Sequence, residues 1–386
     1  MKLALVISSL GGGGAERVMA VLANAWAAGG IDVALITLAS AQDDKYPLDP
    51  AVHRIALGVA GTSESPLNAI GNNFVRIRSL RRAIKACRPD AVISFVTRTN
   101  VLTILAAAGL RVPVIVSERT FLPGERWVHG IWRVAYGPLY RRAAAVVVQT
   151  RRCADEMGAA LGRAISVIPN PLSVASTIIP PGGKSSAACT STGRDAGRTL
   201  LAVGRLSPEK GFDLLIEAFA RVAGRHPRWN LKILGEGMLR HALTERIAAR
   251  GLADRIALPG FDPHVREVMR RSDLFVLSSN FEGFPNVLLE AMAEGMACVS
   301  FDCETGPREL IRHGENGLLV PAENVPALAA ALDTLMQDDG LRAHLGARAR
   351  EVRTLYSLPE VIGKWNALLA AVVARVNPLQ AAEESA

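Results

Sequence analysis

Short apolar segments alternate with helix-length segments along almost the whole chain, and this alternation limits the fold more than any other feature of the sequence. One set of apolar segments precedes residue 170 and a second set follows residue 199. Strands that alternate with helices form a parallel sheet with helices on its faces. The sequence therefore predicts an α/β chain with two Rossmann-like domains. The predicted strands are residues 2–8, 33–38, 91–95, 112–117, 144–149, 165–168, 200–203, 231–234, 256–258, 274–277, 297–301 and 317–320.

The segment between the two sets predicts the domain boundary. Residues 173–198 are rich in Ser, Thr, Gly, Ala and Pro, a composition typical of a linker or flexible loop. We expect an N-terminal domain over residues 1–172, a C-terminal domain over residues 199–356, and a final helix and tail over residues 357–386. Ligands of such sheets bind beyond the carboxyl ends of the strands, so two facing domains would leave a cleft between their loops.

Residues 278–309 combine a strand end, a turn and a helix start, and we expect the chemistry here. Pro285 suits a first helical position, because it has no N–H to leave unpaired and its φ is already helical. The start of such a helix attracts an anion such as phosphate. Glu282 lies in the turn and Glu290 just over one turn into the helix, so the two carboxylates should reach different parts of one ligand. The pair alone is weak evidence, because most glutamates at such a spacing lie on solvated helix faces.

A second candidate segment, residues 204–211, follows the first strand of the second domain. Arg205 offers a planar fork of donors and Lys210 a point charge, a combination suited to a leaving diphosphate. The chain has no Asp-x-Asp motif, and Asp-Cys-Glu at 302–304 is only a loose imitation. We therefore expect the two cations and the helix amides to replace a metal, with no metal site and no other cofactor.

Four glycines at residues 11–14 follow the first strand of the chain. Their spacing is not the strict dinucleotide pattern, and no acidic residue follows the second strand, which argues against a nicotinamide cofactor. A flexible turn without a ligand is one interpretation. We favour a close approach of the backbone at Gly13 and Gly14 to a diphosphate or an acceptor, because four glycines lose folding entropy that a plain turn would not require.

Three motifs together resemble those of the retaining family 4 glycosyltransferases: Glu-Gly-Phe-Pro-Asn-x-x-x-Glu-Ala-Met-Ala-x-Gly at 282–295, Thr-Gly-Pro-Arg-Glu at 305–309 and Gly-Arg-Leu-x-x-x-Lys-Gly at 204–211. The resemblance covers nearly the whole chain and implies the GT-B fold, with the last helix returning to the first domain. It implies that Glu290 binds the donor ribose and that Glu282 contacts the sugar ring. Further donor contacts are implied at Gly283, Phe284, Asn286, Val287, Leu288, Gly235, Gly237, Pro259, Gly260 and Phe261.

The same resemblance implies how transfer occurs and where the acceptor binds. Glu282, Arg205 and Lys210 form the predicted catalytic set. They would support front-face attack, in which the departing phosphate oxygen takes the acceptor proton, unlike hydrolases that use a paired acid and nucleophile. In the first domain, residues 97–100 and 117–120 lie at strand ends, and Ser-Glu-Arg in the latter resembles enzymes that extend polyprenyl-diphosphate-linked glycans. The predicted acceptor-binding residues are Glu118, Arg119, Arg98 and Thr99.

All of the excess positive charge lies in the first half of the chain. Residues 1–175 hold 20 Lys and Arg against 11 Asp and Glu, whereas residues 176–386 hold 24 against 25. Residues 74–88 are predicted to form a basic amphipathic helix, and residues 126–142 interleave Trp and Tyr with Arg. A sheet-covering helix with a solvated Arg face is the competing interpretation. We predict contact with an anionic membrane surface through both segments, and no nucleic acid, because no RNA- or DNA-binding module is recognisable. The apolar residues at helical spacing in the first segment are Phe74, Ile77, Leu80, Ile84 and Cys87.

Cysteine usage and hydropathy bear on location. The five cysteines include no Cys-x-x-Cys pair, which argues for a reducing cytosol and against a disulfide framework or a zinc site. No apolar run approaches the length needed to span a bilayer. We expect a cytoplasmic protein, peripheral on the inner face of the cytoplasmic membrane. The cysteines are Cys87, Cys153, Cys189, Cys298 and Cys303.

The sequence thus predicts a retaining glycosyltransferase that moves a hexose or N-acetylhexosamine from a UDP- or GDP-sugar to a lipid-linked or nascent polysaccharide acceptor. Two other enzymes would keep the fold: a sugar-nucleotide epimerase, and a phosphorylase. The phosphorylase needs a pyridoxal lysine, and no Lys occurs between Lys232 and Lys364. A non-catalytic scaffold that binds nucleotide sugar or membrane is the alternative of another class, and the intact set of charged site residues argues against it.

Overall fold

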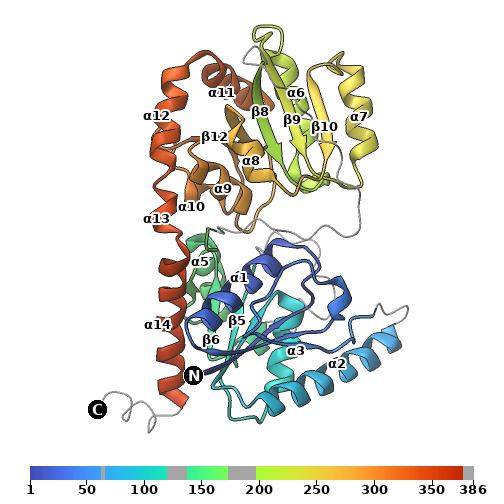
Figure 1. The fold of residues 1–386 in the computed structure, drawn as a ribbon, viewed down its shortest axis with the longest axis vertical. Helices are drawn as coiled ribbons and strands as arrows, with labels where there is room; N and C mark the ends of the chain where they lie inside the picture. The colour runs from blue at the N-terminus through green and yellow to red at the C-terminus, as the bar shows by residue number, and fades with distance from the viewer. Residues whose placement is uncertain (62–65, 120–136, 173–196, 377–386) are drawn as a thin grey trace. The chain divides into compact units, whose positions relative to one another are not determined.

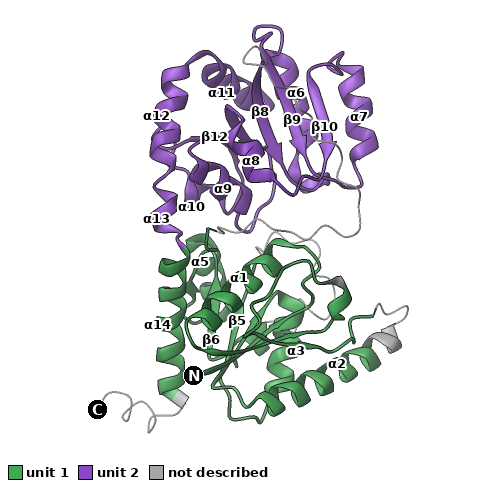
Figure 2. Cartoon of the chain, viewed as in Figure 1, with its two compact units in different colours: residues 1–173, 358–386 green, residues 174–357 purple. Residues whose placement is uncertain are grey.

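The computed structural model describes residues 1–61, 66–119, 137–172 and 197–376 (Figure 1). These residues form two compact units, each described here by itself (Figure 2). Unit 1 comprises residues 1–173 and 358–386, and unit 2 comprises residues 174–357. Each unit is built on a parallel sheet with helices packed against it, so the predicted α/β class with two Rossmann-like halves is confirmed.

The sheet of unit 1 has seven strands in the order β3-β2-β1-β4-β5-β6-β7. The apolar runs predicted these strands, except β3, which is short and only half-buried. Their bounds are Lys2–Ile7 (β1), Asp32–Thr37 (β2), His53–Ala56 (β3), Ala91–Phe95 (β4), Val114–Ser117 (β5), Ala145–Val148 (β6) and Ser166–Val167 (β7). The helices of this unit are Gly14–Ala28 (α1), Pro66–Cys87 (α2), Thr97–Ala107 (α3), Arg151–Leu161 (α5) and Leu358–Val376 (α14), with a 3-10 turn at Ala41–Asp43 (η1).

The sheet of unit 2 has six strands in the order β10-β9-β8-β11-β12-β13. Its core is a continuous apolar cluster between this sheet and the helices α6, α7, α11 and α12. The strands are Arg198–Val203 (β8), Trp229–Leu234 (β9), Ile256–Gly260 (β10), Leu274–Leu277 (β11), Ala297–Asp302 (β12) and Leu318–Pro321 (β13). The helices are Pro208–Lys210 (η3), Phe212–Val222 (α6), Arg240–Ala249 (α7), Val265–Arg270 (α8), Asn286–Glu294 (α9), Pro307–Leu310 (α10), Val325–Gln337 (α11), Asp339–Ala349 (α12) and Val352–Leu355 (α13).

Both sheets reverse their strand order at the same topological point. In unit 1, β1 lies between β2 and β4, and in unit 2, β8 lies between β9 and β11. The chain therefore adds strands on one side of β1 first and then on its other side, and it does the same around β8. The loops beyond the carboxyl ends of such strands diverge and form the usual ligand site of an open α/β sheet. This topology places the residues after β8 and β11 at one edge of unit 2.

The last helix, α14, packs on unit 1. Its Trp365 is fully buried, with its ring 6.1 Å from that of Trp26 on α1 and 6.2 Å from that of Phe95 at the end of β4. The indole N–H of Trp26 also donates to Asn366 Oδ1 at 2.9 Å. The apolar core of unit 1 is therefore completed by a segment that follows unit 2 in the sequence.

Candidate active site

The loop after β8 packs directly on the loop after β11. Gly211 ends the 3-10 turn with φ of 57°, and a Cβ there would collide with the Ser278 carbonyl, so glycine allows this close approach. The Ser278 hydroxyl donates to the Lys210 carbonyl at 2.9 Å, and the Asn280 amide donates to the Glu209 carbonyl at 2.9 Å. These contacts fix Lys210 against the turn that contains Glu282.

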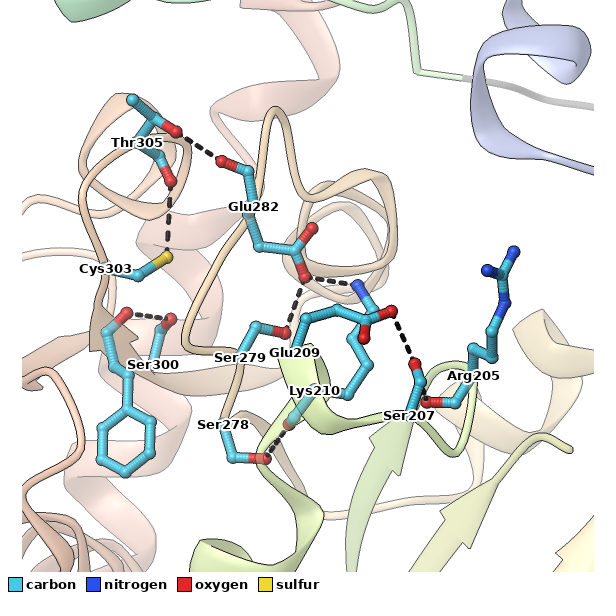
Figure 3. Close-up of polar contacts among 11 residues, drawn as sticks. Arg205, Ser207, Glu209, Lys210, Ser278, Ser279, Glu282, Ser300, Cys303 and Thr305 are labelled. Atoms are coloured by element: carbon cyan, nitrogen blue, oxygen red, sulfur yellow. Dashed lines mark hydrogen bonds and ion pairs between the residues drawn. The ribbon is translucent and has the colours of Figure 1, made fainter. Parts of the chain in front are cut away.

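An ion pair joins the two segments singled out from the sequence. Lys210 Nζ lies 2.6 Å from Glu282 Oε1, and the Ser279 hydroxyl donates to the same oxygen at 2.7 Å (Figure 3). The Glu282 side chain is buried, whereas that of Lys210 retains 21% exposure. The Thr305 hydroxyl donates to the Glu282 carbonyl and holds the turn from its other side. A partly exposed ammonium fixed beside a buried carboxylate gives this edge a defined pair of charges.

The turn leads into α9, with Glu290 on its second turn. The helix begins at Asn286, and Pro285 has φ of −81° and ψ of 82°. Pro285 is therefore the capping residue rather than the first helical residue that the sequence predicted. The difference of one position follows from the ψ angle, which is not helical. Glu290 is buried, at 7% exposure. The structure thus brings Glu282, Glu290 and Lys210 to one region of unit 2, at the end of β11 and the start of α9.

The segment from Phe284 to Leu288 is held by contacts that the sequence did not reveal. Phe284 is buried, with its ring 5.9 Å from that of Tyr356, and the Tyr356 hydroxyl donates to the Glu309 carbonyl at 2.8 Å. Gly306 has φ of 96°, and a Cβ there would lie 2.7 Å from Pro285 Cδ. The Phe284 side chain therefore braces the turn, and a donor contact at this residue would come from its backbone.

Arg205 differs from the other predicted catalytic residues. It follows β8 and is exposed, and Figure 3 shows its guanidinium extending away from the Lys210–Glu282 pair. Its neighbour Ser207 donates to Glu209 Oε1 at 2.6 Å. The structure therefore places Arg205 at the same strand end as Lys210 but leaves its guanidinium apart from the ion pair.

Backbone conformation and close packing account for the predicted glycines of unit 2. Gly235 has φ of 141°, and a Cβ there would collide with the Gly204 carbonyl. A Cβ on Gly237 would likewise collide with the backbone of Leu206. Gly260 has φ of 96°, and its neighbours Pro259 and Phe261 are exposed. These glycines permit the loops after β8, β9 and β10 to pack closely, which holds with or without a ligand.

In the glycine loop of unit 1, the Glu16 side chain already binds a backbone amide of the loop. The carboxylate of Glu16 accepts from the Gly13 amide and from the Ser9 hydroxyl, and the first of these bonds is one half of a capping box at the start of α1. The Tyr46 hydroxyl donates to the Gly13 carbonyl at 3.0 Å. A diphosphate at Gly13 and Gly14 would therefore meet a carboxylate that already uses one of the loop amides. Glu16 was not among the predicted site residues, although its place three residues after Gly13 suits a hydrogen bond back to the helix start.

The predicted acceptor residues occupy different environments at the carboxyl edge of unit 1. Glu118 is buried and accepts from the Thr97 hydroxyl at 2.9 Å and from the Tyr140 hydroxyl at 2.7 Å. Thr99 is also buried, at 1% exposure, whereas Arg98 is exposed. Arg119 is buried beside Phe95. Glu118 thus serves a network inside the unit, and Thr99 faces the core.

The predicted basic amphipathic helix exists as α2, but its faces differ from the expectation. Leu80, Ile84 and Cys87 are buried, as the competing interpretation of a sheet-covering helix implies, whereas Phe74 is 63% exposed. Arg76 is buried and donates to the carbonyls of Val59 and Gly61 and to Asn73 Oδ1. A long guanidinium on the inner face can reach backbone carbonyls, and for this reason the apolar pattern alone misassigned it. The exposed large apolar residues of α2 are Ile70, Phe74 and Val75, its exposed basic residues are Arg78, Arg82 and Lys85, and exposed Arg88 follows directly after its end.

Most of the second predicted membrane segment, residues 126–136, lies outside the described residues. Tyr140, within the described part, is fully buried, and Arg141 donates to the Leu161 carbonyl at 3.1 Å. In that part of the segment the aromatic ring of Tyr140 lies in the core, whereas Arg141 and Arg142 are exposed. Within the residues that the structure describes, no helix is long and apolar enough to cross a bilayer.

Four cysteines lie in the described part of the chain, all of them free and buried, while Cys189 lies outside it. Burial raises the pKa of Cys303 to about 12, and it raises the pKa of Cys298 as well. In the same part of the chain, no three His, Cys, Asp or Glu side chains are grouped as a bound metal ion would need. The four thiols are Cys87, Cys153, Cys298 and Cys303.

Two family models match the chain, one in each unit. A model described as glycosyl transferase 4-like domain matches residues 13–171. A model described as glycosyl transferases group 1 matches residues 191–352, which include the Lys210–Glu282 pair and α9. Together the two models cover every strand of the two sheets except β1.

Individual proteins are also similar to this chain in sequence or in structure. The exopolysaccharide phosphotransferase SCO2592 of Streptomyces coelicolor is 38% identical over 245 residues, which are 62% of this chain and 25% of that protein. The match thus spans about a quarter of that relative. The N-acetylgalactosamine-N,N'-diacetylbacillosaminyl-diphospho-undecaprenol 4-alpha-N-acetylgalactosaminyltransferase of Campylobacter jejuni is 29% identical over 352 residues, covering 88% of this chain and 92% of that protein. Among solved structures, HepE of Anabaena in complex with UDP superposes with a TM-score of 0.75 at 19% identity, covering 96% and 100% of the two chains.

Proposed function

We propose that this chain of the GT-B fold is a family 4 glycosyltransferase that transfers a hexose or N-acetylhexosamine from a UDP- or GDP-sugar, with retention of configuration at the anomeric carbon; the two family models and the Campylobacter relative support the proposal. The proposal rests first on the ion pair between Lys210 Nζ and Glu282 Oε1, 2.6 Å apart at the carboxyl edge of the unit 2 sheet. This edge is the place where an open α/β sheet binds a nucleotide.

The contacts of these residues suggest a division of roles. Lys210 and Arg205 would neutralise the charge that develops on the leaving diphosphate, together with the amides at the start of α9. Glu290, on the second turn of that helix, would accept hydrogen bonds from the ribose hydroxyls. Glu282 would accept from the sugar hydroxyls through the oxygen that Lys210 and Ser279 leave available. All of these groups lie within unit 2.

The state of Glu282 favours front-face attack over a covalent intermediate. Its Oε1 is held by an ammonium at 2.6 Å and by a hydroxyl at 2.7 Å. A carboxylate stabilised in this way is a weak nucleophile, whereas retaining hydrolases present a carboxylate directly to the anomeric carbon. The departing phosphate oxygen would then accept the proton of the attacking hydroxyl. The C–O bond to phosphate breaks as the new glycosidic bond forms on the same face.

The acceptor class is proposed from the relatives. The Campylobacter enzyme is named for a sugar acceptor linked to diphospho-undecaprenol. By that similarity, we assign to this chain a lipid-linked or nascent polysaccharide acceptor, which unit 1 would bind at its carboxyl edge. Such an acceptor would keep the protein in the cytoplasm at the inner face of the cytoplasmic membrane.

A panel of nucleotide sugars tests the donor assignment. One UDP- or GDP-sugar is expected to raise the melting temperature, because a ligand at 100 times its Kd stabilises the folded state by about 2.7 kcal/mol. The stabilisation, and the release of nucleoside diphosphate from that sugar, should persist in EDTA, because cations of the chain replace a metal. Glu290→Ala is expected to remove the shift. Loss of activity in EDTA would contradict the metal-free proposal, and acceptor-independent isomerisation of the sugar would favour the epimerase.

The outer face of α2 supports membrane contact. Exposed Ile70, Phe74 and Arg78 follow one another at intervals of four residues, so an apolar half and a basic half lie along one stripe. We propose that this stripe binds an anionic membrane surface, with the apolar residues in the interface and the cations near phosphate groups.

Neutralising the exposed cations of α2 is expected to weaken binding to anionic vesicles by about 100-fold, because each such cation contributes about 1 kcal/mol near an anionic surface. The variant is Arg78→Gln/Arg82→Gln/Lys85→Gln, and it leaves out Arg81, which donates to the carbonyls of Ala106 and Ala108. Sedimentation with phosphatidylserine vesicles at low salt measures the effect. The matched control neutralises three exposed arginines of unit 2 and should bind as the wild type does. An equal loss of vesicle binding in the α2 variant and in the control would show that the effect comes from net charge and not from α2. The control residues are Arg221, Arg228 and Arg271.

A further inference from the structure

Arg119 is a buried cation of unit 1, and its guanidinium is fixed on two sides. It follows β5 at the carboxyl edge of the sheet and is 7% exposed. Its Nη1 donates to Asn170 Oδ1 at 2.6 Å, and its Cζ lies 3.6 Å from the centroid of the Phe95 ring. A hydrogen bond at one end and a ring beneath one face hold the guanidinium in a single orientation.

The remaining edge of this guanidinium has no partner among the residues that the structure describes. Nε and Nη2 of Arg119 are both buried there without a hydrogen bond. The N–H bonds on these two nitrogens are parallel and match two oxygens of a phosphate or carboxylate. Burial lowers the pKa of Arg119 to about 9, although the charge of the neighbouring Glu118 acts to raise it. A buried ionised donor without a partner is expensive to retain, and native structures keep such groups mainly where a ligand completes them.

Glu118 does not supply the missing partner. Its oxygens accept from the Thr97 and Tyr140 hydroxyls and from the Arg119 backbone amide. The backbone before Thr97 is itself strained, since Val96 has φ of 74°, a conformation that is rare for a β-branched residue. Strained backbone is concentrated at ligand sites. The surroundings of Arg119 therefore include the Glu118 carboxylate, whose charge acts on Arg119 and whose oxygens accept from other groups, but no hydrogen bond to Nε or Nη2 among the described residues.

We propose that the Nε–Nη2 edge of Arg119 binds the diphosphate of the lipid-linked acceptor, with Phe95 and Asn170 as the positioning residues. The assignment of this diphosphate to the acceptor rests on the proposed function. Two phosphate oxygens would accept from Nε and Nη2 in a side-on bidentate pair. Glu118 then takes no part in acceptor contact and serves to hold Thr97 and Tyr140 in place. The acceptor residues predicted from the sequence thus divide into one binding group and its support.

Calorimetric titration with inorganic pyrophosphate tests the site without any transfer reaction. The parent protein is the full chain with Arg205→Ala and Lys210→Ala, so that the proposed donor cations are absent. In this parent, Arg119→Met is expected to weaken pyrophosphate binding by about 10- to 100-fold, the range for a lost bidentate charged pair. Arg119→Lys, which keeps the charge without the fork, should lose about tenfold. Arg111→Met is the matched control, because Arg111 is exposed and precedes the same strand, and it should bind as the parent does.

A second measurement avoids dependence on the folding of variants. In the wild-type chain, the Nε–H resonance of Arg119, identified by its absence in Arg119→Lys, should shift on addition of pyrophosphate. Farnesyl diphosphate should produce the same shift at lower concentration than inorganic phosphate does. In transfer assays, Asn170→Ala should raise the KM for the acceptor and leave the donor KM unchanged.

The outcomes separate the two proposals. The subsite would be overturned if Arg119→Met bound pyrophosphate as tightly as the parent does. It would also be overturned if pyrophosphate left the Nε–H resonance of Arg119 unmoved. Binding of inorganic phosphate as tight as that of farnesyl diphosphate would overturn the assignment to a lipid-linked diphosphate. Binding that depends on Arg119 in a protein without transferase activity would reject the proposed function and leave the diphosphate site in place.

Discussion

Replacement of Lys210 by alanine is expected to lower the rate of sugar transfer by about 100- to 1,000-fold, the usual effect of removing one group that stabilises developing negative charge. The ammonium is fixed at the end of β8 by the contact of Gly211 with the Ser278 backbone, and it is partly exposed toward solvent. Its position beside Glu282 would hold it ready for the leaving diphosphate. Initial rates at saturating donor and acceptor measure the loss.

Two companion variants separate catalysis from folding. Lys210→Ala alone leaves the Glu282 carboxylate buried without its cation, which should lower the free energy of unfolding by about 1–3 kcal/mol. Lys210→Ala/Glu282→Gln removes that unpaired charge and should recover most of the stability, but not the activity. Lys364→Ala breaks a Lys–Glu contact of 3.7 Å on the exposed face of α14 and should change neither. Normal turnover in Lys210→Ala would remove this residue from the mechanism.

Truncation of Trp365 to alanine is expected to destabilise unit 1 by about 3–5 kcal/mol, the range for a buried aromatic side chain replaced by alanine. The side chain is fully buried and contacts the rings of Trp26 and Phe95. Its loss would leave a cavity between α14, α1 and the end of β4. Unit 2 contains none of these residues and should be unaffected.

Buried thiols allow the two units to be followed separately during unfolding in urea. Cys87 and Cys153 are buried in unit 1, and Cys298 and Cys303 are buried in unit 2. In Trp365→Ala, the two thiols of unit 1 should become labelled at a lower urea concentration than in the wild type. The two thiols of unit 2 should keep their wild-type midpoint. Trp365→Phe should shift the first pair less, because it preserves one ring. A common shift of all four thiols would show that the units unfold together.

The strands were predictable because their apolar runs are short, complete and bounded by turn residues. Every predicted run became a strand of one of the two sheets. The strand that was not predicted, β3, reads His-Arg-Ile-Ala and lies at a sheet edge, where only part of a strand is buried. Periodicity gives little signal for such a strand. The order of the strands and their reversal at β1 and β8 followed from the βαβ pattern only in outline.

The site residues were predictable in kind but not in their contacts. The motif spacing indicated Lys210 and Glu282 as charged groups at strand ends, but nothing local showed that residues 72 apart would form one ion pair. The supporting roles of Ser279, Thr305 and Tyr356 depend on how separate loops meet. Such meetings are set by tertiary packing, which leaves no periodic trace in the sequence. Arg76 and Phe74 exchanged their expected faces for the same reason.

The position of Trp365 has a consequence during synthesis of the chain. Its partners Trp26 and Phe95 leave the ribosome early, whereas α14 emerges only after the whole of unit 2. At 5–20 residues per second, the nascent unit 1 would wait roughly 10–40 s with that apolar surface uncovered. The first unit made is therefore the last to be completed. Chaperone binding to the nascent chain is expected to concentrate on the surface around Trp26 and Phe95 until the final helix arrives.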